Sequence, residues 1–203
     1  MPEVAADIFL AFSELPVILL IIIAGYILIE RQLFFRAACL AAITIIVNTA
    51  LKGVFQIPLA LSVGKIGYAF PSGHMQFAVT LYVWLACNYR SWALKIITVI
   101  LLSGIAFGLM LYGYHNIYDV LGGIFSGVLL VYLYSYANIK LGRNLSWVLF
   151  LMVSGVMIFN FFIYTPIPQH TLAAYFILLL LLSLCPRNRK VGLDSGQKDN
   201  LHT

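Results

Sequence analysis

Long apolar runs separated by short polar stretches dominate this sequence and constrain its fold more than any other feature. A helix needs about 20 mostly apolar residues to cross the hydrocarbon core of a bilayer. The chain is 63% hydrophobic and 9% charged over 203 residues, which leaves too few charges to cover a water-exposed surface. The sequence therefore predicts an all-α integral membrane protein, a polytopic helical bundle of about six to seven transmembrane spans.

Polar breaks divide the apolar sequence into seven candidate spans. These cover residues 8–29, 33–55, 71–88, 92–112, 119–139, 145–164 and 171–185. The first contains a kink or restart at Ser13-Glu14-Leu15-Pro16, and only Pro166-Ile167-Pro168 separates the last two. Residues 56–70 are too short to cross, so we expect an outer loop or re-entrant piece there. We expect a membrane domain over residues 1–186 and a disordered polar tail over 187–203.

The distribution of lysine and arginine predicts the orientation of the bundle, because these residues favour the cytoplasmic side. If successive spans alternate in direction, one side holds ten of the twelve cations, and the opposite side holds Lys52 and Lys65. The ten are Arg31, Arg36, Arg90, Lys95, Lys140, Arg143, Arg187, Arg189, Lys190 and Lys198. We therefore expect an outer N-terminus and a cytoplasmic C-terminus. Loop charges also explain the net charge of +5 without a nucleic-acid partner.

Two histidines and an aspartate are candidates for catalysis. From His74 to His115 the chain descends one predicted span and returns along the next, so both histidines reach the same face. Ionisable residues at membrane depth are costly and usually functional. Asp119 lies four residues after His115, a spacing that lets its carboxylate bond one imidazole nitrogen while the other attacks. His74 is placed to give or take a proton.

The residues around these histidines suggest an anion as ligand. Ser72 and Gly73 precede a predicted helix, and amides at a helix start bind phosphate. Lys52 and Lys65 would neutralise its charge. The alternative for either lysine is a side chain that extends to the lipid headgroups. His170, His202 and Glu14 receive no functional role, because an isolated polar residue near a membrane surface is usually interfacial.

These motifs resemble the type 2 phosphatidic acid phosphatase family, whose fold is shared with vanadium haloperoxidases. Pro71-Ser72-Gly73-His74 matches one family motif in full, and His115 with Asp119 matches the spacing of another. Lys52 fits the start of a third, and the resemblance covers a core of about residues 52–140. The chain departs from the family at both arginine positions, which fall on Leu59 and Leu109, and the serine position falls on Gly108.

The resemblance implies hydrolysis of a phosphomonoester or pyrophosphate on a membrane lipid, without metal or other cofactor. His115 would attack phosphorus to give a phosphohistidine, Asp119 would orient His115, and His74 would protonate the leaving group. Lys65 would replace a missing arginine. Candidate substrates are phosphatidate, phosphatidylglycerol phosphate, undecaprenyl pyrophosphate and a lipid A phosphate. We would expect such an enzyme in a bacterial inner membrane, with its site facing the periplasm or exterior. The alternatives are a non-catalytic lipid-phosphate binder or transporter component, and a lipid phosphotransferase.

Overall fold

The computed structural model describes residues 2–59, 67–89, 91–164 and 166–184. Within these ranges the chain forms eight α-helices and one short 3-10 helix, and no β-strand, which confirms the all-α prediction. In chain order they are α1 (Pro2–Ala11), α2 (Leu15–Leu28), α3 (Arg31–Phe55), α4 (Gly73–Asn88), α5 (Trp92–Leu111), α6 (Ile117–Leu141), η2 (Gly142–Asn144), α7 (Leu145–Ile163) and α8 (Gln169–Leu184). Lys65, His202 and the predicted tail lie outside the described residues.

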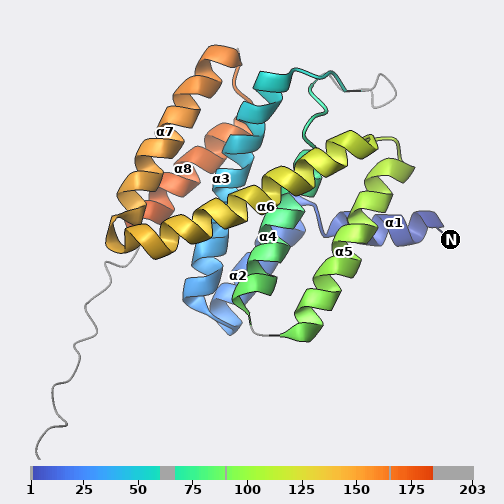
Figure 1. Ribbon diagram of the computed structural model, residues 1–203, viewed down its shortest axis with the longest axis horizontal. Helices are drawn as coiled ribbons and strands as arrows, with labels where there is room; N and C mark the ends of the chain where they lie inside the picture. The colour runs from blue at the N-terminus through green and yellow to red at the C-terminus, as the bar shows by residue number, and fades with distance from the viewer. Residues whose placement is uncertain (1, 60–66, 90, 165, 185–203) are drawn as a thin grey trace, which may run out of the picture.

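Helix α3 is the central element of the bundle, with α2, α4, α7 and α8 packed around it (Figure 1). Two polar contacts join it to its C-terminal neighbours. The hydroxyl oxygens of Thr49 and Thr171 lie 2.7 Å apart, and Asn160 Nδ2 donates to the Ile46 carbonyl over 3.1 Å. Buried polar groups need such partners, especially where lipid surrounds the helices. These bonds fix α7 and α8 against the helix that carries Lys52.

Helices α4 and α6 cross at close range because glycine replaces larger side chains at their contact (Figure 1). A Cβ atom added at Gly123 would lie 2.8 Å from the Ser72 carbonyl oxygen, and one at Gly127 would lie 2.8 Å from Val79 Cγ1. Small residues allow membrane helices to approach in this way. Gly123 and Gly127 are therefore packing positions, and this approach brings the start of α6 to the start of α4.

The helices follow the predicted spans to within a few residues, but they differ in their capacity to cross a membrane. Four are long and apolar enough to span a bilayer: α3, α5, α6 and α7. Helices α1 and α2, bent by 51° at the predicted break near Glu14, add a fifth if the pair is counted as one span. At 16 residues each, α4 and α8 are shorter, and α4 is largely buried within the bundle. The structure thus supports four to five spans, and the count of six to seven stays a prediction.

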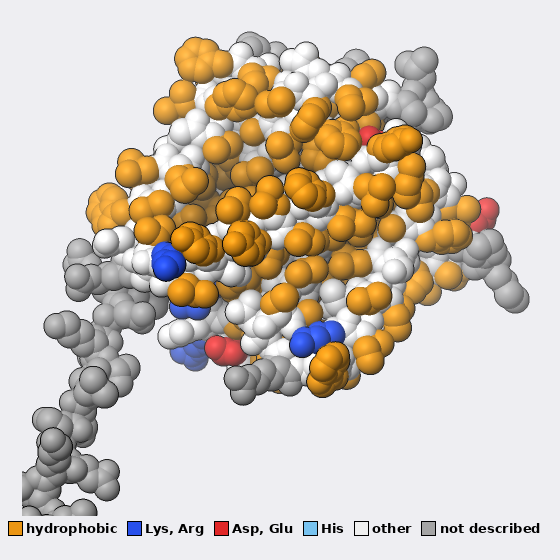
Figure 2. All heavy atoms as spheres, viewed as in Figure 1, with side chains coloured by type: hydrophobic (Ala, Val, Ile, Leu, Met, Phe, Trp, Pro, Cys, Tyr) orange, Lys and Arg blue, Asp and Glu red, His pale blue; other side chains and the backbone are white. Residues whose placement is uncertain are grey.

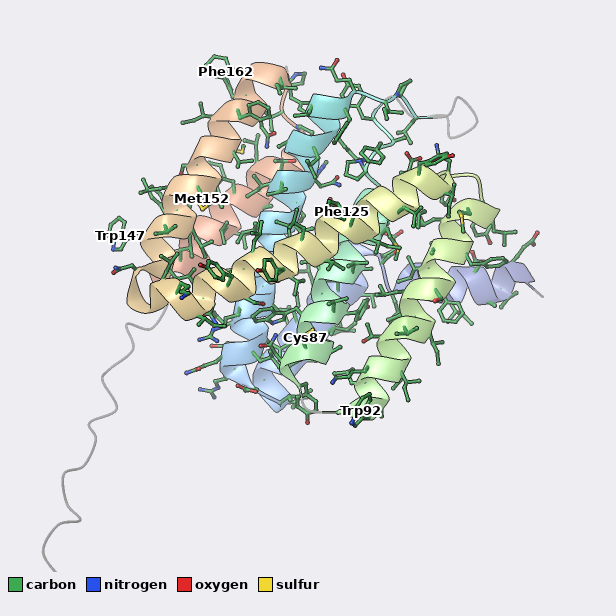
Figure 3. The ribbon with its side chains drawn as sticks, in the orientation of Figure 1. Cys87, Trp92, Phe125, Trp147, Met152 and Phe162 are labelled. Carbon is green, nitrogen blue, oxygen red and sulfur yellow. The ribbon has the colours of Figure 1, made fainter. Side chains whose placement is uncertain are left out.

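The outer surface of the bundle suits a lipid environment. Hydrophobic side chains cover the face of Figure 2, and lysine and arginine gather toward its lower margin. Trp92 and Trp147, in the first turns of α5 and α7, are exposed at 79% and 69% and project from the bundle (Figure 3). Tryptophan favours the membrane interface. The distribution fits an integral membrane protein whose cations gather at the end opposite the α5–α6 turn, as Figures 1 and 2 together show.

Candidate active site

The turn between α5 and α6 places His115 inside the bundle. Gly113 adopts φ +66°, a left-handed conformation that glycine accepts without the cost of a side chain. The amides of Tyr114 and His115 then donate to the Leu109 carbonyl over 3.1 and 3.3 Å, which folds the turn back onto the end of α5. The His115 side chain is consequently buried rather than exposed to the outer solvent.

Asp119 is held in place by a capping box at the start of α6. Asn116 Oδ1 accepts the Asp119 amide over 2.9 Å, and Asp119 Oδ2 accepts the Asn116 amide over 3.1 Å. This reciprocal pair satisfies two amides that a helix start leaves unbonded. It also fixes the direction of the carboxylate, so Asp119 is oriented before any substrate arrives.

His115 and Asp119 face each other across a short gap. His115 Nδ1 lies 3.4 Å from Asp119 Oδ2, slightly longer than an ordinary hydrogen bond, and this buried nitrogen has no hydrogen-bond partner among the described residues. Contacts of this kind often tighten only when substrate binds. Since Nδ1 points at the carboxylate, Nε2 is the ring nitrogen directed away from it.

The start of α4 is bonded directly to the start of α6. The Ser72 amide donates to the Asp119 carbonyl over 3.0 Å, and Ser72 Oγ caps α4 by accepting the Met75 amide over 3.5 Å. Ser72 is fully buried, and its amide is already occupied by the bond to the Asp119 carbonyl. The predicted role of Ser72 in binding phosphate stays a prediction. A role for the helix start would depend on later first-turn amides such as that of Gly73.

Asn48 of α3 supports this helix start, a role that the sequence analysis did not anticipate. Its Nδ2 donates to Gln76 Oε1 over 2.6 Å and to the Pro71 carbonyl over 3.3 Å. A Cβ added at Gly73 would lie 3.1 Å from Asn48 Oδ1, so glycine suits this contact. An asparagine within an apolar helix was the available signal, but its partners lie more than 20 residues away and could not be read from spacing.

Lys52 brings positive charge to the same cluster. Burial and, next in size, the neighbouring Lys52 charge lower the pKa of His115 from 6.5 to about 4. Asp119 opposes this shift, and His74 adds to it weakly. The net result keeps His115 neutral near pH 7, which is the form of imidazole that can attack an electrophile.

Most of the predicted site residues meet at one end of the bundle. These are Lys52, Ser72, Gly73, His74, His115 and Asp119, and Lys65 lies outside the described residues. Within the described ranges, no group of three or more His, Cys, Asp and Glu side chains is arranged to hold a metal ion.

Leu59, Gly108 and Leu109, where the sequence comparison expects the family's serine and arginines, take part in packing and backbone hydrogen bonds. Leu109 is buried, and its carbonyl anchors the His115 turn. A Cβ added at Gly108 would lie 2.9 Å from Leu10 Cγ, so α1 occupies the space into which a side chain would project. Leu59 donates its amide to the Gly67 carbonyl over 2.9 Å in the loop after α3.

Two residues near the cluster were given no role in the sequence analysis. Glu14 Oε1 lies 3.6 Å from His74 Nε2, and His170, in the first turn of α8, lies within electrostatic range of Lys52. Glu14 could have been noticed as a single acid at a break between apolar helices. Its contact with His74 depends on tertiary structure, and sequence spacing does not indicate it.

The protein is a helical membrane bundle, and one end of it holds two histidines, a carboxylate and a lysine. These residue types together make a candidate acid–base site. The family model described as the PAP2 superfamily matches residues 34–143, more than half of the 203-residue chain. The chain therefore belongs to the PAP2 superfamily, and this membership supports a phosphatase-type function. No curated protein and no solved structure matches the chain. The matched region contains the histidine pair, whereas Glu14 and His170 lie outside it.

Proposed function

We propose that this protein hydrolyses a phosphomonoester or pyrophosphate of a membrane lipid through a phosphohistidine intermediate. The observation that carries the proposal is the bonded junction of α4 and α6, where Ser72 donates to the Asp119 carbonyl. This bond joins the helix start that carries His74 to the backbone of Asp119, the residue whose carboxylate faces His115. Membership in the PAP2 superfamily supports a phosphatase-type reaction at these residues.

In the first half-reaction, His115 Nε2 attacks phosphorus while the bond from phosphorus to the leaving oxygen breaks. The electron pair of that bond stays on the leaving oxygen, which takes a proton from the His74 imidazolium. Asp119 accepts the hydrogen bond of His115 Nδ1–H and stabilises the positive charge that develops on this ring. The products are a free lipid alcohol, or a lipid monophosphate, and a phosphohistidine.

In the second half-reaction, water attacks the phosphohistidine. Neutral His74 takes a proton from that water, inorganic phosphate leaves, and both histidines return to their starting states. Each histidine therefore has one task in each half of the cycle. The chain itself supplies both the nucleophile and the acid–base group.

Phosphate charge would be neutralised by Lys52, with the Gly73 amide as a hydrogen-bond donor and Lys65 as a second cation. Lysine offers a point charge rather than the planar fork of arginine. Since removal of one transition-state donor costs roughly 100- to 1,000-fold in rate, we expect slow turnover at this site. The absence of a cation at Leu59 and Leu109 is also what favours the second candidate, a non-catalytic lipid-phosphate binder.

The sidedness belongs to the proposal as well. The bias of lysine and arginine supports a site on the periplasmic or external face of a bacterial inner membrane, with the C-terminus in the cytoplasm. A reporter fused after Thr203 should therefore behave as a cytoplasmic protein. A periplasmic signal there would contradict this orientation.

The experiment that tests the activity is phosphate release by purified protein in detergent with EDTA. Phosphatidate, phosphatidylglycerol phosphate, undecaprenyl pyrophosphate and a lipid A phosphate form the substrate panel. We expect release from at least one lipid, its loss in His74→Ala and His115→Ala, and its retention in His202→Ala. Lipid binding without release by the wild-type protein would favour the binder instead.

A further inference from the structure

Glu14 lies where the N-terminal helices break, and its carboxylate contacts a histidine of the candidate site. Its Oε1 atom is 3.6 Å from His74 Nε2, and both side chains are about half exposed, at 57% and 48%. Glu14 is the residue that precedes α2, yet its side chain makes no capping hydrogen bond to that helix. The carboxylate is therefore directed at His74 instead of serving its own helix.

The break that carries Glu14 is held from two directions. Tyr82 of α4, eight residues beyond His74, donates its hydroxyl to the Phe12 carbonyl over 2.7 Å. Ser13 is buried and donates to the Leu10 carbonyl over 2.7 Å. The first bond ties the break to the helix that presents His74, and the second closes the end of α1, so the position of the break does not depend on the Glu14 side chain alone.

Helix α1 adds a third attachment, against α5. Cβ atoms added at Gly104 and Gly108 would overlap the Phe9 ring and the Leu10 side chain, so the two helices are in close contact. At the outer end of α5, the Tyr112 hydroxyl donates to Asp7 Oδ1 over 2.6 Å. The N-terminal segment is thus packed as part of the site wall.

A purely stabilising role does not account for this pair. Exposed ion pairs contribute little to stability, since solvent screens them and side-chain entropy opposes them. A carboxylate beside an imidazole has a clear chemical effect, because it favours the protonated ring. The protonated ring is the form of His74 that the proposed first half-reaction requires.

We infer that Glu14 is a positioning residue that holds His74 as an imidazolium, ready to protonate the leaving oxygen of a lipid phosphate. This inference rests on the proposed function. As the phosphorus–oxygen bond breaks, the proton passes from His74 to the leaving oxygen, and His74 becomes neutral beside Glu14. In the second half-reaction the proton taken from water restores the ion pair. Among the described residues, the other titratable groups at or near the cluster are Lys52, His115, Asp119 and His170, and none of these belongs to the N-terminal segment.

The test compares Glu14→Gln, which keeps the shape and removes the charge, with Glu14→Asp, which keeps the charge. Glu30→Gln is the matched control, because Glu30 is an exposed acid that precedes α3 and also makes no capping bond. For an alkyl phosphate we expect Glu14→Gln to lower kcat about tenfold, part of the ~10²- to 10⁴-fold that a general acid contributes. In the plot of kcat against pH, the basic limb of Glu14→Gln should move to lower pH. A nitrophenyl phosphate, whose leaving group needs no proton, should be hydrolysed by this variant nearly as fast as by the wild type. Glu14→Asp should retain the wild-type basic limb.

Histidine titration by NMR, with His74→Asn for assignment, separates this inference from the proposed function. The His74 ring should lose its proton at lower pH in Glu14→Gln than in the wild type, whether or not the protein turns over lipid. An unchanged titration would overturn the inference. So would faster turnover in Glu14→Gln, which would mean that the carboxylate occupies the phosphate position. If the wild-type protein showed no turnover, that result would instead contradict the proposed function. The titration would then still test whether Glu14 is paired with His74.

Discussion

The two histidines of the site have opposite surroundings. His115 is buried behind the α5–α6 turn, with Asp119 at 3.4 Å and the Lys52 charge nearby. His74 is about half exposed and faces the carboxylate of Glu14. Burial and positive charge favour a neutral ring, whereas an accessible ring beside a carboxylate favours the protonated form. The difference supports the proposal that His115 is the nucleophile and His74 the proton donor, on physical grounds that do not depend on motif order.

Removal of each ring should separate the two roles most strongly. His115→Ala should lower turnover by roughly 10⁶-fold, the scale for loss of a nucleophile. His74→Ala should lower it by roughly 10²- to 10⁴-fold, and less for substrates with good leaving groups. Initial rates on alkyl and nitrophenyl phosphates measure both effects. The assignment of roles would be reversed if His115→Ala showed the stronger dependence on the leaving group.

Asp119 has two tasks, and paired variants can separate them. Asp119→Asn should lower kcat by roughly 10³- to 10⁴-fold, because the amide cannot stabilise the His115 charge or hold the correct tautomer. Asn116→Ala removes the other half of the capping box and should cost about 1 kcal/mol of stability, with most activity retained. Equal loss of activity in the two variants, measured at matched folded fractions, would reduce Asp119 to a capping residue.

The contact between α4 and α6 should tolerate no added side chain at Gly123. A Cβ there would lie 2.8 Å from the Ser72 carbonyl, so Gly123→Val should destabilise the protein by about 1–3 kcal/mol. Gly155→Val in α7 is the matched control, since a Cβ at Gly155 meets nothing within 4 Å. Thermal unfolding in detergent measures both. Similar melting temperatures for the two variants would contradict the close approach of the helices.

The smallest expected effect is a shift in the pH dependence of stability and of kcat/KM. The pKa of His115 is lowered from 6.5 to about 4, so the folded ring stays neutral down to about pH 4 while the unfolded ring takes up a proton near pH 6.5. Stability from this group is therefore present above pH 6.5 and declines as pH falls toward 4. The acid limb of kcat/KM should lie well below pH 6.5, and Lys52→Met should move it upward. An acid limb near 6.5 in the wild type would show that His115 is not buried beside a positive charge.

Hydrophobicity predicted the elements of the fold well, because each apolar run must become a helix to satisfy its backbone in lipid. The limits of α3, α5 and α7 differ from prediction by only a few residues. Whether each helix crosses the membrane was less accessible, because α4 is short and buried among neighbours that its own sequence does not reveal. Length alone therefore does not give the span count.

The candidate site was predicted where short spacing around one helix start decides it, as with His115 and Asp119. It was not predicted where distant segments meet. Glu14 reaches His74 only because α1 and α2 bend by 51° and α4 lies against the break. Asn48 likewise supports Pro71 and Gln76 across a helix interface. Such contacts depend on the packing of helices and leave no periodic pattern in the sequence.

The most direct test of the central claim is detection of the phosphoenzyme itself. Purified protein, quenched during turnover of a phosphate-labelled lipid, should carry label that is stable in base, lost in acid and located on His115 by mass spectrometry. Asp119→Asn should carry less label, and His115→Ala should carry none. Label located on His74, or turnover with no labelled histidine at any quench time, would contradict the account.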